Sequence, residues 1–130
     1  MCIFCDIVEK KIPSKVVYED DQVLAMLDIN PLSKGHTVIL PKKHVDSLLE
    51  SDEETVLACA KVAHLLSKHI CEKLNADGCN LLVNSHESAG QSVNHMHFHV
   101  IPRYKNDAVI VLNEPAPSID LDEVLETIKY

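Results

Sequence analysis

Several features that would assign this chain to a familiar class are absent from its sequence. No apolar run approaches the ~20 residues of a membrane-spanning helix, and the start of the chain lacks the basic residues and long apolar region of a secretory signal. Basic residues are outnumbered, and the formal net charge of -8 disfavours general binders of nucleic acid or anionic membranes, which need basic patches. We therefore expect a cytoplasmic protein with no nucleic-acid or membrane partner. A nucleotide site built locally from backbone amides and histidines is still allowed.

Linkers, internal repeats and low-complexity segments are also missing, so we predict a single domain over residues 1–130. A chain of this length, with 46% hydrophobic residues, can form a core that needs no disulfides. Five cysteines are an odd count, which argues against a disulfide framework. Cys59, Cys71 and Cys79 have apolar neighbours in sequence and are expected to be buried. Cys2 and Cys5 form a C-x-x-C pair that needs a separate explanation.

The secondary structure expected from residue patterns is mixed. β-prone segments predict strands at 15–19, 23–28, 36–40, 80–84 and 95–101, with one more strand possible at 109–112. A helical turn is expected over 2–10 and a short final helix over 121–129. The long helix is predicted to begin at Ser51, which forms a capping box with Glu54, and to end at Asp77-Gly78. Strands joined as neighbouring hairpins, with helices between groups, indicate the α+β class.

The most unusual stretch is His-Met-His-Phe-His-Val-Ile at 95–101. Strict alternation is the period of a β-strand, so His95, His97 and His99 should share one face while Met96 and Phe98 enter the core on the other. Three imidazoles on one face are unusual because each is polar and titrates near neutral pH. A solvated histidine-rich face is the weakest explanation. A metal site and a nucleophile with acid–base neighbours are the two stronger ones.

Both explanations have support in the residues. A neutral imidazole attacks phosphorus well when one ring nitrogen is free and the other proton is held, and the middle histidine, His97, is the natural candidate. The preceding loop, 89–92, can aim backbone N–H groups at an anion. Separately, Cys2 and Cys5 have the spacing of half a structural zinc site. His44 and one triad histidine could complete it, and both interpretations can hold at once.

Residues 95–101 match at every position the signature of the histidine-triad (HIT) proteins, in which three histidines alternate with apolar residues. The similarity covers roughly residues 2–105 and resembles the Hint-like branch, most closely its zinc-containing members; 106–130 form a tail that matches no branch clearly. The segments that carry it are Ile-Phe-Cys-Asp-Ile at 3–7, Leu-Asp-Ile at 27–29, Gly-His-Thr-Val-Ile-Leu-Pro-Lys-Lys-His at 35–44, Ala-Gly-Gln-Ser-Val at 89–93 and Ile-Pro-Arg at 101–103. The resemblance implies a HIT fold with an antiparallel sheet of about five strands, one long helix and a short C-terminal helix.

The resemblance also implies chemistry at the α-phosphate of a nucleotide. In the family the middle histidine forms a covalent nucleotidyl-histidine that water then hydrolyses, a role that falls on His97. The third triad position is His rather than the Gln of the galactose-1-phosphate uridylyltransferase branch, which favours hydrolysis over transfer. We expect a hydrolase of adenosine 5'-phosphoramidates. The alternatives are a dinucleoside polyphosphate hydrolase of the Fhit type and a non-catalytic nucleotide-binding regulatory module.

Site residues follow from the same resemblance. The catalytic group is His97, His99, His36 and Ser92. The contacts expected for an AMP- or GMP-type nucleotide are an apolar base slot (Ile3, Phe4, Ile7, Leu27, Ile29), the ribose-binding Asp28, Asn84 at the phosphate or the ribose, and a phosphate side made by Gly90, Gln91, Ser92, His97 and His99. One structural Zn²⁺ is expected on Cys2, Cys5, His44 and His95. Family members are usually homodimers, so a homodimer is expected here.

Overall fold

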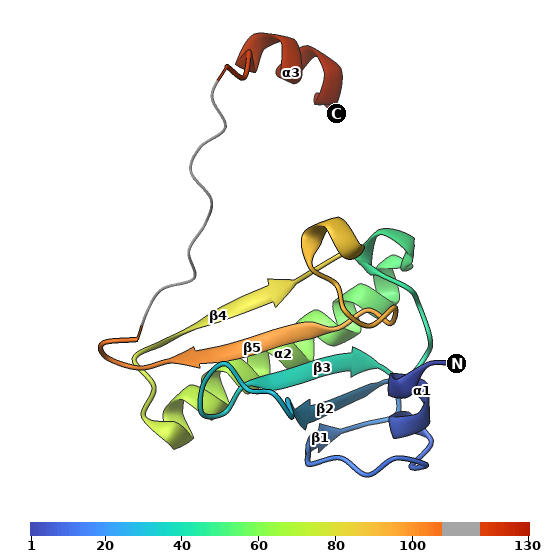
Figure 1. Cartoon of the computed structure of the whole chain (residues 1–130), viewed down its shortest axis with the longest axis vertical. Coiled ribbons are helices and arrows are strands. Elements are labelled where there is room, and N and C mark those ends of the chain that lie inside the picture. Colours follow the sequence, from blue (N-terminus) through green and yellow to red (C-terminus); the bar gives the residue numbers. More distant parts are fainter. Residues whose placement is uncertain (108–117) are drawn as a thin grey trace.

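The computed structural model describes residues 1–107 and 118–130. Its sheet has five strands, and every neighbouring pair is antiparallel, in the order β1-β2-β3-β5-β4 (Figure 1). The α+β class and the five-stranded antiparallel sheet are therefore confirmed, whereas the possible strand at 109–112 lies outside the described residues. The elements are α1 (Ile3–Val8), β1 (Val16–Glu19), β2 (Val23–Leu27), β3 (Thr37–Pro41), a 3-10 turn (Leu48–Glu50), α2 (Glu53–Leu74), β4 (Gly78–Val83), a second 3-10 turn (Glu87–Ala89), β5 (Phe98–Arg103) and α3 (Leu121–Ile128).

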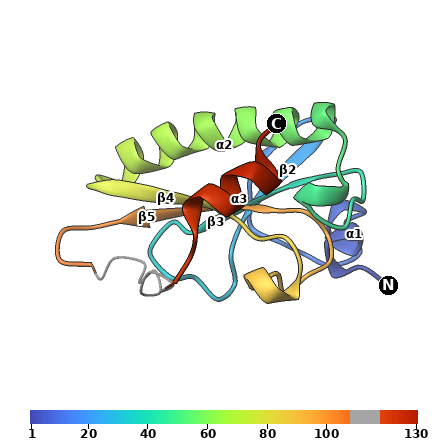
Figure 2. The same cartoon turned by 90° about the horizontal axis from the view of Figure 1, so that it is seen from above.

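The core lies between α2 and one face of the sheet (Figure 2). The helix buries Cys59, Ala63, Leu66 and Ile70, which recur at steps of three and four and so share one face. Met96, Phe98 and Val100 meet this face from the sheet. A smaller cluster of Ile7, Leu24, Met26, Val38 and Leu40 packs under α1 on the opposite face of the sheet. None of the described helices is long and apolar enough to cross a bilayer.

Both predicted ends of the long helix were wrong by a few residues. The N-cap is Asp52, because its carboxylate accepts the Thr55 N–H at 3.0 Å, whereas the Ser51 hydroxyl donates to the Asp52 carbonyl. At the other end Asn75 adopts the left-handed conformation (φ 55°) that stops the helix. Gly78 is the first residue of β4 and takes no part in the helix end.

The strand prediction for the triad was right for His99 and wrong for His95 and His97. The strand β5 begins at Phe98. The Met96 N–H donates to the Val45 carbonyl at 2.8 Å, and the His95 N–H donates to Val93, so these groups bond to loops and not to a strand ladder. The side chains still alternate, with Met96 and Phe98 in the core under α2.

The cysteine prediction was also only partly right. Cys59 is fully buried, Cys71 is half-buried and Cys79 is exposed. The physical reason is that Cys79 lies on β4, an edge strand that pairs with β5 on one side only.

Candidate active site and metal centre

The predicted active-site histidines gather on the face of the sheet opposite α2. His97 and His99 lie with their ring centroids 4.9 Å apart, and His36 from the start of β3 lies 5.2 Å from His99. The ring of Phe4 in α1 meets His97 edge-on at 5.1 Å. His36 and His97 are buried and His99 is half-buried. Phe4 therefore closes the cluster on the side of α1.

The protonation of His97 follows from one hydrogen bond. Its Nδ1 lies 2.7 Å from the carbonyl oxygen of His95. A carbonyl can only accept, so Nδ1 carries the proton and the lone pair is left on Nε2. Burial, partly opposed by this hydrogen bond and by Asp28, holds the pKa of His97 below its ordinary value. His97 is therefore neutral at pH 7 with a free Nε2, which is the form a nucleophile requires.

A second chain of hydrogen bonds fixes His36 and His99. The Leu32 N–H donates to Nδ1 of His36 at 3.0 Å, which leaves the His36 proton on Nε2. That N–H lies 3.0 Å from Nδ1 of His99, so His99 accepts there and keeps its own proton on Nε2. His99 can then donate this N–H to a phosphate oxygen. Burial lowers the pKa of both residues, and for His99, with His97 and His36 beside it, to about 4.

Asp28, His36 and His99 have one ligand atom each within 4.8 Å of the others, a grouping that could suggest a metal. The tautomers argue against it. Because the Leu32 N–H occupies Nδ1 of His36, the nitrogen that faces the group is the protonated Nε2. The group is better described as the hydrogen-bonded pair His36–His99, with the Asp28 carboxylate in electrostatic contact at 3.5 Å from His36 Nε2.

The predicted base slot is a real hollow. A cavity of about 160 Å³ is lined by Ile3, Phe4, Ile7, Leu27, Asp28 and Ile29, as the resemblance implied. The structure adds lining residues that the sequence did not reveal, namely Ile12, Pro13, Ser14, Met26 and Val38. Residues 12–14 lie in the connection between α1 and β1, where no periodic pattern marks a site.

The loop before the triad is held by Gln91. Its Oε1 accepts the His86 N–H at 2.6 Å, and its Nε2 donates to the carbonyls of Asp46 and Val93 at 2.6 and 2.9 Å. Both ends of the amide are thus engaged, and the side chain shapes the loop. Gly90 has φ 94°, a left-handed conformation that favours glycine, whereas an added Cβ would meet only Asn84 Nδ2, at an ordinary contact distance of 3.7 Å.

Ser92 lies apart from the histidine cluster. It is exposed and lines a neighbouring open hollow of about 470 Å³ together with Cys2, His44 and Asp46. Within the part of the chain that the structure describes, no hydrogen bond joins Ser92 to His97 or His99. Its predicted role on the leaving-group side is therefore the least supported of the catalytic assignments.

The predicted metal ligands are brought together. Nδ1 of His95 lies 3.4 Å from Cys2 Sγ and 3.6 Å from Cys5 Sγ, and Nδ1 of His44 lies 3.3 Å from Cys5 Sγ. All four ligand atoms are within 4.8 Å of one another. Tetrahedral Zn²⁺ with ordinary Zn–S and Zn–N bonds places S and N about 3.5 Å apart. The donor set therefore fits zinc in both chemistry and spacing.

The hydrogen bonds made by Nε2 of His95 and His44 also favour a metal site. Nε2 of His95 donates to the Pro41 carbonyl at 2.7 Å, and Nε2 of His44 donates to the Asp46 carboxylate at 2.8 Å. Each histidine therefore presents the lone pair of Nδ1 to the thiols. Such second partners usually orient histidine ligands of metals. Burial raises the pKa of Cys2, but the backbone N–H of Cys5 and neighbouring side chains outweigh it, so the net shift is downward. Burial and the adjacent Cys2 raise the pKa of Cys5 to about 11, so one of the two thiols is favoured as the thiolate.

Comparison with known proteins agrees with this geometry. An uncharacterized HIT-like protein of Methanocaldococcus jannaschii is 47% identical over 99% of both chains. The adenosine 5'-monophosphoramidase of Saccharomyces cerevisiae is 33% identical over 95% of this chain and 75% of that protein. The solved Zn-bound histidine triad family protein of Mycobacterium smegmatis is 38% identical, with a TM-score of 0.81, over 88% of this chain and 84% of that one. The model of the HIT domain matches residues 9–106, and the chain belongs to the HIT family.

The lowered pKa of the half-buried His99 predicts how stability depends on pH. The pKa of His99 is about 4 in the folded protein and 6.5 ordinarily, so between these values the unfolded chain binds more protons and stability falls as the pH falls. We expect His99→Gln to flatten the decline of Tm between pH 6.5 and 4.5. Thermal denaturation at matched zinc content measures it, with His64→Gln, an exposed site on α2, as the control. Equal slopes for His99→Gln and the wild type would contradict a neutral His99 with a lowered pKa.

Proposed function

We propose that this protein hydrolyses adenosine 5'-phosphoramidates through a covalent nucleotidyl intermediate on His97. The observation that carries the proposal is the hydrogen bond from His97 Nδ1 to the His95 carbonyl, because it leaves Nε2 as a free nucleophile. The similarity to an adenosine 5'-monophosphoramidase supports the same reaction class.

The first step forms a bond between His97 Nε2 and the α-phosphorus and breaks the P–N bond, and the leaving nitrogen takes a proton from solvent and departs as the amine; the hydrolysis step returns a proton to solvent. Positive charge that appears on the imidazole is stabilised by the His95 carbonyl on Nδ1. The N–H on Nε2 of His99 donates to a phosphoryl oxygen, and His36 holds that tautomer. Ser92 is assigned to the leaving-group side. Water then attacks phosphorus, releases the nucleoside monophosphate and restores neutral His97.

The nucleoside is assigned to the apolar slot beside the triad. The base would lie between α1 and residues 27–29, where Ile3, Phe4 and Leu27 form the walls. The Asp28 carboxylate suits two hydrogen bonds from the ribose hydroxyls. Asn84, Gly90 and Gln91 remain assigned to the phosphate side, with Gln91 acting through the shape of its loop. An AMP- or GMP-type nucleotide satisfies this set.

An amine leaving group is favoured over a polyphosphate on charge. The hollows on either side of α1 are lined by no lysine or arginine among the described residues, and they contain the carboxylates of Asp28 and Asp46. A diadenosine polyphosphate would bring further negative charge next to these carboxylates, and, within the described residues, neither hollow supplies a lysine or arginine to offset it. A neutral or cationic amine leaving group would not be repelled by these carboxylates.

A structural zinc ion is part of the proposal. Cys2, Cys5, His44 and His95 would hold one Zn²⁺ per chain, and four protein ligands leave no open position for a catalytic water. The metal would hold the start of α1 against His95, two residues before His97. A zinc ion bound there would make this region rigid and would take no part in the reaction.

The substrate class is tested by comparing kcat/KM for AMP-morpholidate or AMP-lysine with that for the diadenosine polyphosphates Ap3A and Ap4A. We expect the amidate to be preferred by about 100-fold or more, a discrimination within the range that differential contacts can supply. Faster cleavage of the polyphosphate would favour the Fhit-type alternative. AMP binding without turnover of either substrate would favour the regulatory module.

A homodimer and a cytoplasmic location complete the proposal. The edge strand β4 has one unpaired side and exposes Leu81 (52%) and Leu82 (36%), so a second copy could extend the sheet there. Sedimentation velocity is expected to give a dimer for the wild type and a monomer for Leu81→Asp; a monomeric wild type would contradict the dimer.

The five free cysteines fit a reducing compartment, which supports the proposed cytoplasmic location.

A further inference from the structure

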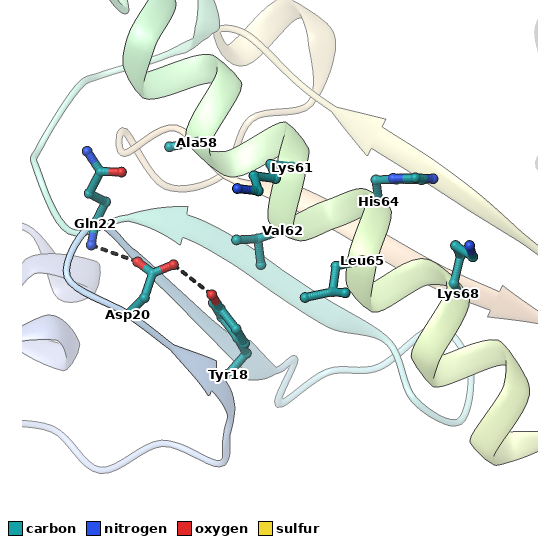
Figure 3. Close-up of a pocket in the computed structure, with 9 residues that line it drawn as sticks. All are labelled: Tyr18, Asp20, Gln22, Ala58, Lys61, Val62, His64, Leu65 and Lys68. Carbon is teal, nitrogen blue, oxygen red and sulfur yellow. Dashed lines mark hydrogen bonds between the residues drawn. The ribbon is translucent and has the colours of Figure 1, made fainter.

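A groove on the far side of the sheet from the histidines takes no part in the proposed chemistry. It lies between α2 and the β1–β2 hairpin and encloses about 360 Å³ (Figure 3). Tyr18, Asp20 and Gln22 form its hairpin wall. The α2 wall consists of Ala58, Lys61, Val62, His64, Leu65 and Lys68. Val62 is buried and Leu65 is half exposed, so the groove has an apolar floor that water reaches.

The free charges at the groove are positive. Among the described residues, Lys61 and Lys68 have no acidic partner within 4 Å, although many of the chain's other lysines do. The one carboxylate of the groove, Asp20, already accepts from the Tyr18 hydroxyl and from the N–H groups of Gln22 and Val23. In a chain of net charge -8, this is an apolar groove with a cationic rim.

The C-terminal helix has the complementary character. Leu121, Val124, Leu125 and Ile128 recur at the spacing of one helical face, and all four are exposed, by 76, 40, 56 and 70%. Figure 1 shows α3 standing apart from the sheet and α2. Its remaining positions are mainly acidic, with Asp122, Glu123 and Glu126 beside and behind the apolar face. An isolated helix this short is marginal in water, so it needs a surface to pack on.

We propose that α3 docks in the groove of its own chain, with its apolar face on Val62 and Leu65 and its acidic residues near Lys61 and Lys68. This is the helix-in-groove mode of recognition, supported here by opposite charge. The exposed leucines of β4, another apolar surface of the described residues, have no lysine or arginine within the strand, and Arg103 of the paired strand β5 is already hydrogen-bonded to Asn80.

The length of the chain permits this docking. The Lys105 N–H is bonded to the Asp77 carboxylate at 2.8 Å, so the chain leaves the sheet beside the C-terminal end of α2. Lys68 is about 9 Å along the helix axis from Leu74. The segment from Asp107 to Asp120 can extend at most about 43 Å. The groove is therefore within reach of the same molecule.

The position of the groove determines whether docking would affect stability or activity. Val62 belongs to the core under α2, together with Phe98, and the histidines face the other side of the sheet. A docked α3 would add buried apolar area to α2 without covering the nucleotide slot. We expect it to raise stability and to leave kcat/KM unchanged.

The docking site is mapped by comparing amide NMR spectra of the full chain and of the double variant Leu125→Asp/Ile128→Asp, whose changes lie outside the core. Shift changes concentrated at Tyr18, Gln22 and residues 61–68 are expected. Changes concentrated at 81–82, or none beyond α3 itself, would overturn the proposal. The same shift changes should be seen in the monomeric Leu81→Asp background; their loss there would assign the groove to α3 of a second copy.

A second test exchanges the charges of the groove lysines and the acidic residues of α3. Lys61→Glu/Lys68→Glu is expected to release α3 and lower Tm by about 4 °C, the effect of roughly 1 kcal/mol in a domain of this size. Adding Asp122→Lys/Glu126→Lys should restore both Tm and the wild-type shifts. The control Lys34→Glu/Lys73→Glu changes net charge equally and should leave α3 docked. Failure of the exchange to restore Tm and shifts would contradict an electrostatic contact at this groove.

Discussion

Replacing His97 by asparagine is expected to lower kcat/KM for an adenosine 5'-phosphoramidate by at least about 10³-fold, because the step that forms the intermediate loses its nucleophile. The asparagine NH₂ can still donate to the His95 carbonyl, so the loop should keep its shape. No nitrogen lone pair then faces the phosphorus. Steady-state kinetics measures the loss, and calorimetric titration with AMP should give an affinity close to that of the wild type.

The matched control for this variant is His69→Asn, which removes an exposed imidazole from α2. It should retain full activity, which separates the loss of one particular histidine from a general change in charge. Substantial turnover by His97→Asn would remove the basis for covalent catalysis at this position. A loss of turnover accompanied by loss of AMP binding would point to a distorted slot instead.

Removing the two cysteine ligands is expected to have the second large effect. Cys2→Ser/Cys5→Ser should lose one zinc per chain by elemental analysis and lower Tm by about 10 °C, the shift that corresponds to roughly 3 kcal/mol in a domain of this size. The physical reason is that Cys2 and Cys5 connect the N-terminal helix to His44 and His95, which are distant in sequence. Without the metal, α1 and Phe4 lose an anchor to the triad.

The control for zinc is Cys71→Ser/Cys79→Ser, which removes two thiols outside the cluster. This variant should keep the wild-type zinc content. Wild-type protein purified without zinc or another metal, or a Cys2/Cys5 variant that still holds zinc at these ligands, would contradict the assignment. The His97 chemistry does not depend on that outcome, because no step passes through the metal.

Much of the fold could be predicted because it depends on local patterns. β-prone segments bounded by turn residues marked the strands, and the 3.6-residue period of Cys59, Ala63, Leu66 and Ile70 marked α2. The ends of α2 could not be fixed in the same way, since Ser51 and Asp52 are both competent caps and only tertiary context chooses between them. Similarly, the backbone bonds of His95 and Met96 go to loops that the sequence does not place.

For the candidate site, too, local patterns could be predicted and tertiary contacts could not. The triad pattern made His97 the candidate nucleophile, the C-x-x-C pair suggested a metal site with His44 and one triad histidine, and the family resemblance chose His95; the structure brings these four candidate ligands into one cluster. The tautomers could not be predicted, because they depend on contacts with the carbonyls of His95 and Pro41 and with the Leu32 N–H. The engagement of both ends of the Gln91 amide was likewise invisible in sequence, since its partners are backbone groups of other segments.

The central claim is that the nucleotide becomes bonded to Nε2 of His97, and the most direct measurement is to trap that adduct. Wild-type protein mixed with an adenosine 5'-phosphoramidate and quenched within one turnover should gain the mass of one adenylyl group. Peptide mapping should place it on His97, and His97→Asn should gain none. An unmodified wild-type protein caught during active turnover, or an adduct that persists in His97→Asn, would contradict the account.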